Sequence, residues 1–207
     1  MTSVPSATTW GSPTATKHAL LIHGLSSSSH TWHRVASSLA AQGRSRSLYT
    51  SDHNASRCST LSGYLVTAPN LIGHASRVST DYHINSIAND LRPYLEARNY
   101  SLIIGHSLGA ATALSLFPHL PPSHPTAIVL VDPPMQQTSE KLDYLDAMIS
   151  DSCINIKSAE AYGAENPLWT REDNIYRELG TRLCSVEAVH GTWSVRDRRL
   201  PGEVVLI

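Results

Sequence analysis

The sequence is short of several features that mark whole classes of protein. It holds three cysteines, Cys58, Cys153 and Cys184, and their odd number and wide spacing argue against a disulfide framework or a zinc knuckle. No apolar stretch reaches the roughly 18 residues of a membrane-spanning helix, and residues 1–16 lack the apolar centre of a secretory signal. Sixteen basic against seventeen acidic residues give a net charge of −1. We therefore expect unpaired thiols, a cytoplasmic location, no membrane span and no nucleic-acid partner.

What the sequence does contain is the composition and rhythm of a globular domain. Its 207 residues are 41% hydrophobic and 16% charged. Four short apolar runs have the length of buried strands: 19–22, 64–68, 101–104 and 127–131. Three further stretches carry apolar residues at helical spacing: 31–42, 85–99 and 110–117. This alternation predicts an α/β fold with a mostly parallel sheet covered by helices. Pro93, inside the second helical stretch, is expected to kink or break that helix.

The pattern divides the chain into four segments. Residues 1–16, rich in Ser, Thr and Pro, are expected to form a flexible N-terminus, and residues 17–134 carry the alternating core. Residues 135–195 are more polar and mostly helical, which predicts a helical cap, or lid, inserted after the Ala127–Val131 strand. Residues 196–207 are expected to return to the core and to end in a strand at 203–207.

Residues 44–63 interrupt this rhythm between a helix and a strand. Twenty residues, six of them serine and three arginine, stand where a connection of about 2–6 residues is usual. Two explanations are open. The segment is either a translated retained intron, since 20 codons make 60 nucleotides and keep the reading frame, or a genuine surface loop, which a fold tolerates at small entropic cost. Sequencing the transcript across the junction separates them.

The stretch Gly105-His106-Ser107-Leu108-Gly109 matches the pattern G-x-S-x-G and stands between a predicted strand and a predicted helix. So sharp a turn forces Ser107 into a strained backbone conformation, and Gly105 and Gly109 remove side chains that would clash there. Ser107 Oγ then projects at the carboxyl edge of the sheet, beside the positive end of a helix. We therefore predict that Ser107 is a nucleophile. His106 is expected to pack beneath it rather than to act as its base.

A second motif, His23-Gly24-Leu25, directly follows the first predicted strand. Backbone N–H groups at this place form one half of an oxyanion hole, and the residue after the nucleophile supplies the other half. The candidate donors are therefore the N–H groups of Leu25 and Leu108. His30 and His33 lack the carboxylate and the third ligand of a zinc site, so no metal site is expected.

On these residues the chain resembles the α/β-hydrolase superfamily, in its serine-nucleophile branch with an HG oxyanion loop. The resemblance rests on these stretches: 23–25, Trp32, 68–74, the elbow 105–109, and 131–134. It implies an α/β-hydrolase fold and the hydrolysis of esters or other acyl bonds without a cofactor. The expected partner is a small, apolar acyl substrate.

The resemblance also implies an acid and then a histidine after Ser107. The predicted strand at 203–207 looks like the one that precedes the family's acid, so the chain looks C-terminally truncated, without matching positions for either residue. Asp132 and His190 are the substitutes that keep the order serine, acid, histidine. Two functions are open: a serine hydrolase, inactive if no base activates Ser107, and a non-catalytic small-molecule-binding protein or inert fragment.

Overall fold

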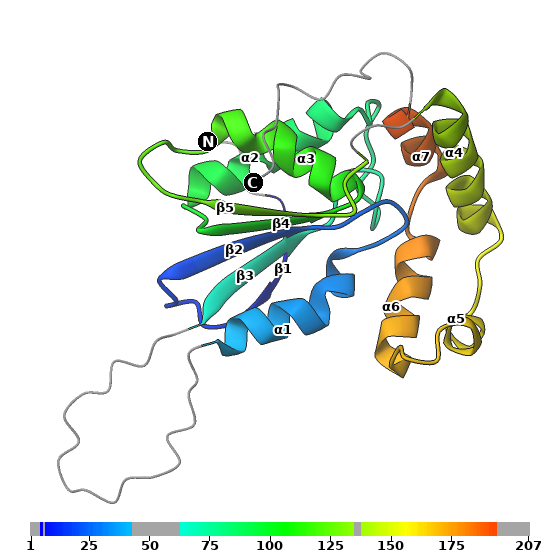
Figure 1. Cartoon of the computed structure of the whole chain (residues 1–207), viewed down its shortest axis with the longest axis horizontal. Coiled ribbons are helices and arrows are strands. Elements are labelled where there is room, and N and C mark those ends of the chain that lie inside the picture. The colour runs from blue at the N-terminus through cyan, green and yellow to red at the C-terminus, as the bar shows by residue number, and fades with distance from the viewer. Residues whose placement is uncertain (1–4, 6, 43–62, 135–137, 194–207) are drawn as a thin grey trace, which may run out of the picture.

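A five-stranded sheet forms the centre of the computed structural model, which describes residues 5, 7–42, 63–134 and 138–193 (Figure 1). Its strands are β1 (Ala7–Trp10), β2 (Lys17–Ile22), β3 (Tyr64–Pro69), β4 (Leu102–His106) and β5 (Ala127–Val131). They lie in the order β1-β3-β2-β4-β5, and every pairing is parallel except that of β1 with β3. The predicted α/β class with a mostly parallel sheet is confirmed.

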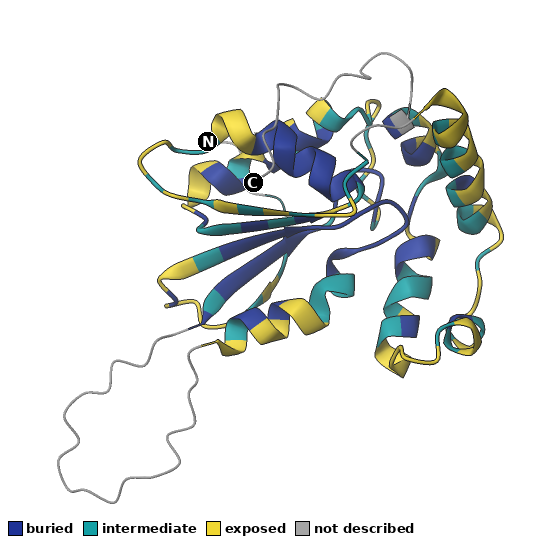
Figure 2. Ribbon diagram, viewed as in Figure 1, coloured by how far each residue is buried: buried dark blue, intermediate teal, exposed yellow. Residues whose placement is uncertain are grey.

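Helices cover both faces of this sheet (Figure 1). On one face lies α1 (His33–Ala41), which continues from the 3₁₀ turn η1 (Ser29–Trp32). On the other face lie α2 (Ile84–Ala97) and α3 (Leu108–Leu116), and a second 3₁₀ turn, η2 (Phe117–His119), follows α3. Figure 2 shows α3 buried along its whole length. The small side chains of its Gly and Ala residues allow α3 to pack closely against the sheet. This packing fixes the turn between β4 and α3.

In the described ranges four helices follow β5, and we refer to them together as the cap: α4 (Ser139–Ile154), α5 (Ala159–Glu165), α6 (Arg171–Arg182) and α7 (Val186–Trp193). Figure 1 shows them grouped beyond one end of the sheet. Helix α6 touches the core directly, because a Cβ atom at Gly180 would lie 2.9 Å from the backbone of Ser27, in the loop after β2. The cap therefore lies at the carboxyl edge of the parallel strands.

The structure departs from the sequence predictions at two elements. Residues 7–10, within the N-terminal segment expected to be flexible, pair with β3 as an edge strand. Helix α2 continues through Pro93 to Ala97, because its buried face, with Ile87 and Leu91, offsets the backbone hydrogen bond that proline removes. The predicted strand at 203–207 and the predicted return to the core at 196–207 lie outside the described residues.

The flanks of the segment 44–63 lie close together. Residues 44–62 are outside the described residues, but a Cβ atom at Gly63 would lie 2.2 Å from the carbonyl oxygen of Ala40, near the end of α1. We expect a variant that lacks 44–63 to fold, with a Tm equal to the parent's or a few degrees higher, since a shorter connection saves about 1–2 kcal/mol of closure entropy. Thermal unfolding followed by circular dichroism measures the Tm. A second deletion variant, with Gly-Ser-Gly at the junction, controls for strain in the shortened connection. If neither variant folds, the segment 44–63 supports the fold and the expectation is wrong.

Candidate active site

Ser107 stands at the junction between β4 and α3 with a backbone conformation that non-glycine residues rarely adopt. Its φ is 51° and its ψ is −116°, a strain that costs about 1–3 kcal/mol. The surrounding backbone holds this conformation: the N–H of Ser107 donates to the carbonyl of Val131 at 2.9 Å, and its own carbonyl accepts from the N–H of Ala110 at 2.9 Å. The strained turn expected from the sequence is therefore present.

Gly105 and Gly109 permit this turn for a steric reason. A Cβ atom at Gly105 would lie 2.2 Å from the carbonyl oxygen of Gly109. A Cβ atom at Gly109 would lie 2.1 Å from the carbonyl oxygen of Ile22, at the end of β2. Both contacts are with backbone, so they cannot be relieved by a side-chain rotation. The elbow is packed directly against the central strand of the sheet.

The His23-Gly24-Leu25 loop lies against the elbow. A Cβ atom at Gly24 would be 3.2 Å from Ser107 Cβ and 3.0 Å from His106 Nδ1. Leu25 and Leu108 are both buried, and no acceptor in the described part of the chain is bonded to the N–H of either residue. Two unbonded backbone donors thus belong to the segments that meet at Ser107, one from each predicted half of the oxyanion hole.

The side chain of His23 holds Gly24 and Leu25 of this loop in position. The N–H of Leu71 donates to His23 Nε2 at 3.1 Å, so that nitrogen is an acceptor and the proton is on Nδ1, which donates to the Gly24 carbonyl at 2.8 Å. Burial lowers the pKa of His23 well below its usual value, and the nearby His74 lowers it further. The imidazole is therefore neutral and serves as a rigid brace for Gly24 and Leu25.

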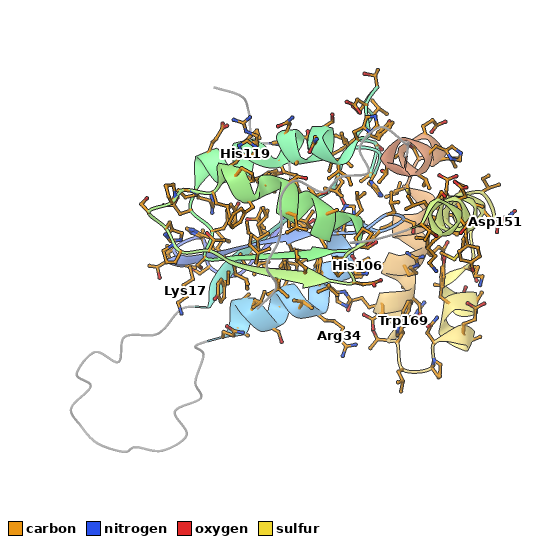
Figure 3. All side chains as sticks on the ribbon, turned by 45° about the horizontal axis from the view of Figure 1, so that its top comes forward. Lys17, Arg34, His106, His119, Asp151 and Trp169 are labelled. Atoms are coloured by element: carbon orange, nitrogen blue, oxygen red, sulfur yellow. The ribbon has the colours of Figure 1, made fainter. Side chains whose placement is uncertain are left out.

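The His106 ring lies beside the His23-Gly24-Leu25 loop, since a Cβ atom at Gly24 would be 3.0 Å from its Nδ1, and the expectation that it packs beneath Ser107 stays a prediction. Side chains alternate along β4, so that Ile103 and Gly105 are buried while His106 points to the opposite face and is exposed. That face continues onto β5, where Val131 is also exposed. Loss of hydration beside Gly24 lowers the pKa of His106, while Asp132 raises it and Arg177 lowers it. Figure 3 places His106 at the end of the sheet nearest the cap.

The structure places Asp132 and His190, the candidates for the acid and the base, in different surroundings. Asp132, with a φ of 48°, follows β5 and is close enough to His106 to influence its pKa. His190 lies in α7, where its Nδ1 is 2.8 Å from Asp146 Oδ2 in α4. Within the described ranges no contact joins His190 to Asp132 or to Ser107. Only Asp132 of this pair stands at the elbow.

Sequence reasoning missed three residues that the cap brings to this edge. Arg177 Nη1 donates to the carbonyl of Ser26 at 2.8 Å and to Ser26 Oγ at 3.2 Å, across 151 residues of sequence. The thiols of Cys153 and Cys184 are free, and a hydrogen bond between them lowers the pKa of Cys153 to about 7 and raises that of Cys184. No spacing or motif signals these contacts, because each joins segments that only the folded cap brings together.

No group of three or more His, Cys, Asp or Glu side chains in the described ranges lies close enough together to hold a metal ion. A bilayer span would need a longer and more continuously apolar helix than any of those described.

One of the comparisons with known proteins identifies a family. A family model described as the alpha/beta hydrolase family matches residues 19–207. An uncharacterized protein of Mycobacterium tuberculosis (strain ATCC 25618 / H37Rv) is 31% identical over 108 residues, which are 49% of this chain and 26% of that protein. The match thus spans about a quarter of the curated relative's length.

Solved structures show the same fold at low sequence identity. N-formylmaleamic acid deformylase from Pseudomonas putida S16 is 20% identical with a TM-score of 0.63, over 90% of this chain and 67% of that one. An esterase from Thermogutta terrifontis is 14% identical with a TM-score of 0.59, over 91% of this chain and 65% of that one. The chain therefore spans about two thirds of the length of these structures.

Proposed function

Because the chain belongs to the alpha/beta hydrolase family, we propose that it is a serine hydrolase of ester-like or other acyl bonds, with Ser107 as its nucleophile. The observation that carries this proposal is the strained Ser107 beside the two unbonded backbone donors of Leu25 and Leu108. The proposed substrate is small and largely apolar, and the proposed reaction uses no cofactor. Relatives of known activity include a deformylase and an esterase.

In the proposed cycle Ser107 Oγ attacks the acyl carbon, and the carbonyl oxygen becomes an oxyanion. The N–H groups of Leu25 and Leu108 donate to this oxyanion, and the positive end of α3 stabilises its charge. The leaving group departs with the proton of the Ser107 hydroxyl. Water then hydrolyses the acyl-enzyme: its hydroxyl joins the acyl carbon, and its proton returns to Ser107 Oγ. Because no imidazole in the described part of the chain is bonded to Ser107, we propose a rate limited to what the oxyanion hole supplies, roughly 10³–10⁴ over water.

The second candidate function is the binding of a small acyl compound without turnover. The observation that favours it is the position of His190, which is paired with Asp146 rather than with Asp132. A serine without a general base is a weak nucleophile, so the same site would hold its ligand without cleaving it.

Reaction with a fluorophosphonate probe tests the first function against the second. We expect slow labelling that reaches one probe per chain, located at Ser107 by mass spectrometry of the peptides, and no labelling of Ser107→Ala. Ser37→Ala, at an exposed position in α1, is the matched control and should react like the parent. If the folded parent chain, verified by circular dichroism, remains unlabelled, the nucleophile is not activated and the binding function is favoured.

A further inference from the structure

Helix α6 holds one basic side chain directly above the proposed oxyanion loop. Gly180 brings the helix backbone against Ser27, and Arg177, three residues earlier, projects from the same face onto Ser26. Ser26 has a φ of 49° and directly follows Leu25, the proposed oxyanion donor. Arg177 is therefore attached to the residue next to that donor.

Arg177 has no acidic partner in the described part of the chain. Its contacts there are the carbonyl and hydroxyl of Ser26 and the ring of Tyr162, whose centroid lies 5.7 Å from the guanidinium carbon. The acidic residues next to it on α6 are otherwise engaged. Asp173 binds Thr170 and Arg34, and Glu178 binds Arg182 and the N–H of Ala159. The guanidinium is therefore half-buried, with some N–H donors that have no hydrogen-bond partner among the described residues and with no carboxylate to balance its charge there.

The positive charge of Arg177 acts on the site and is reachable from solvent. Burial lowers the pKa of His106 in the elbow, and the charge of Arg177 lowers it further. The hydrogen bond from Cys184 lowers the pKa of Cys153 in the cap, and Arg177 adds to that lowering. It also lines a hollow of about 250 Å³ between α6 and the start of α1, together with His33 and Trp169. Figure 3 labels Trp169 on the same side of the molecule as His106.

We propose that Arg177 binds a carboxylate on the acyl group of the substrate, so that Ser107 acts on otherwise apolar acyl compounds that carry one negative charge. Guanidinium groups bind carboxylates through two parallel hydrogen bonds, and the unused Nη2 and Nε donors of Arg177 fit this pairing. The contact to Ser26 and the ring of Tyr162 hold the guanidinium in place before the substrate arrives. The inference names the substrate class of the proposed hydrolase and rests on that proposed function.

A pair of esters that differ only in this charge tests the proposal. Mono-p-nitrophenyl adipate carries a carboxylate where p-nitrophenyl hexanoate carries a methyl group, and p-nitrophenolate release with enzyme in excess reports acylation. We expect the parent to prefer the adipate ester, and Arg177→Gln to lower that preference at least tenfold, with partial recovery in Arg177→Lys. Arg171→Gln removes an equal charge at an exposed position of the same helix and should keep the parent's preference. Equal losses for both esters in Arg177→Gln would show that Arg177 only supports Ser26, and would overturn the proposal.

A binding measurement separates this proposal from the proposed nucleophile. In the Ser107→Ala chain, calorimetry with monomethyl adipate and methyl hexanoate measures recognition without acylation. We expect the adipate to bind at least tenfold more tightly, and Arg177→Gln in the same background to abolish the difference. If the parent is never acylated but this difference is found, the hydrolase proposal fails and the carboxylate site stands. If the two compounds bind equally, the carboxylate site is refuted whatever Ser107 does.

Discussion

Replacing Gly109 by alanine is expected to lower the free energy of unfolding by about 3 kcal/mol. A Cβ atom there would lie 2.1 Å from the carbonyl oxygen of Ile22 and 2.7 Å from that of His23, and both atoms belong to the backbone at the end of β2. Relief of this clash requires a shift of α3 against the central strand. Alanine otherwise favours a helix over glycine by about 1 kcal/mol. A loss of stability therefore reports the steric contact and not helix propensity.

The measurement is urea unfolding of the parent and of two alanine variants. Gly163→Ala in α5 is the matched control, because its new Cβ atom would meet only the end of the Asn174 side chain, at 2.9 Å. We expect this control to change stability by less than about 1 kcal/mol, and Gly109→Ala to lower Tm by roughly 6–12 °C. Similar unfolding curves for the two variants would contradict the packing of the elbow described above. Gly109→Ala should also lose fluorophosphonate labelling, since the clash displaces the turn that holds Ser107.

The elbow could be predicted because its determinants are consecutive in the sequence. Five residues specify the end of β4, the strained Ser107 and the start of α3, and the clashes at Gly105 and Gly109 lie within that turn or against its neighbouring strand. The apolar runs of β2 to β5 are equally local, because a parallel strand covered on both faces needs a continuous apolar stretch. Strand β1 escaped prediction since an edge strand of four residues, with two threonines, carries no such run.

The remainder of the site depends on contacts between segments that are distant in the sequence. The side of β4 on which His106 emerges follows from the pleat, but its exposure depends on what lies over β5. His190 pairs with Asp146 across 44 residues, and Arg177 reaches Ser26 across 151 residues. Such pairings follow from how the cap helices pack on the core. Residue order alone, which suggested Asp132 and His190 as partners, contains no information about that packing.

Acidification from pH 7 to pH 5 is expected to destabilise the chain, chiefly through two buried histidines, His23 and His74, next to the proposed oxyanion loop. His23 and His74 are both 1% exposed, and their rings meet edge to face with centroids 4.8 Å apart. Burial lowers the pKa of His74 to about 4 and lowers that of His23 well below its usual value. Because the unfolded chain protonates these rings near pH 6.5, the unfolded state binds more protons than the folded state between pH 6.5 and about 4. The contribution of these two histidines to the free energy of unfolding is therefore fully present above pH 6.5. It is lost as the pH drops through this window.

His74 alone should account for about 2 kcal/mol of lost stability between pH 7 and pH 5, and His23 adds to the loss in the same direction. Urea unfolding at the two pH values measures the sum. His74→Asn retains a donor for the carbonyl of Ile72, which His74 Nδ1 contacts at 3.3 Å, but removes the titrating ring. We expect this variant to lose about 2 kcal/mol less on acidification than the parent, while His119→Asn, at an exposed position, controls for the loss of one imidazole. An unchanged pH dependence in His74→Asn would mean that His74 is not buried as a neutral ring.

The same protonation should reach the site before the whole chain unfolds. A protonated His23 cannot accept the hydrogen bond from the N–H of Leu71, which would leave that donor buried and unbonded. The brace of Gly24 and Leu25 then weakens, and with it one of the two proposed oxyanion donors. Fluorophosphonate labelling of Ser107 should therefore decline on acidification at a urea concentration where the parent is still folded. His74→Asn should shift that decline to higher pH, because it removes the neighbouring ring whose charge opposes protonation of His23. If labelling instead declines only as the circular dichroism signal is lost, His23 supports the fold as a whole and has no separate part in positioning Leu25.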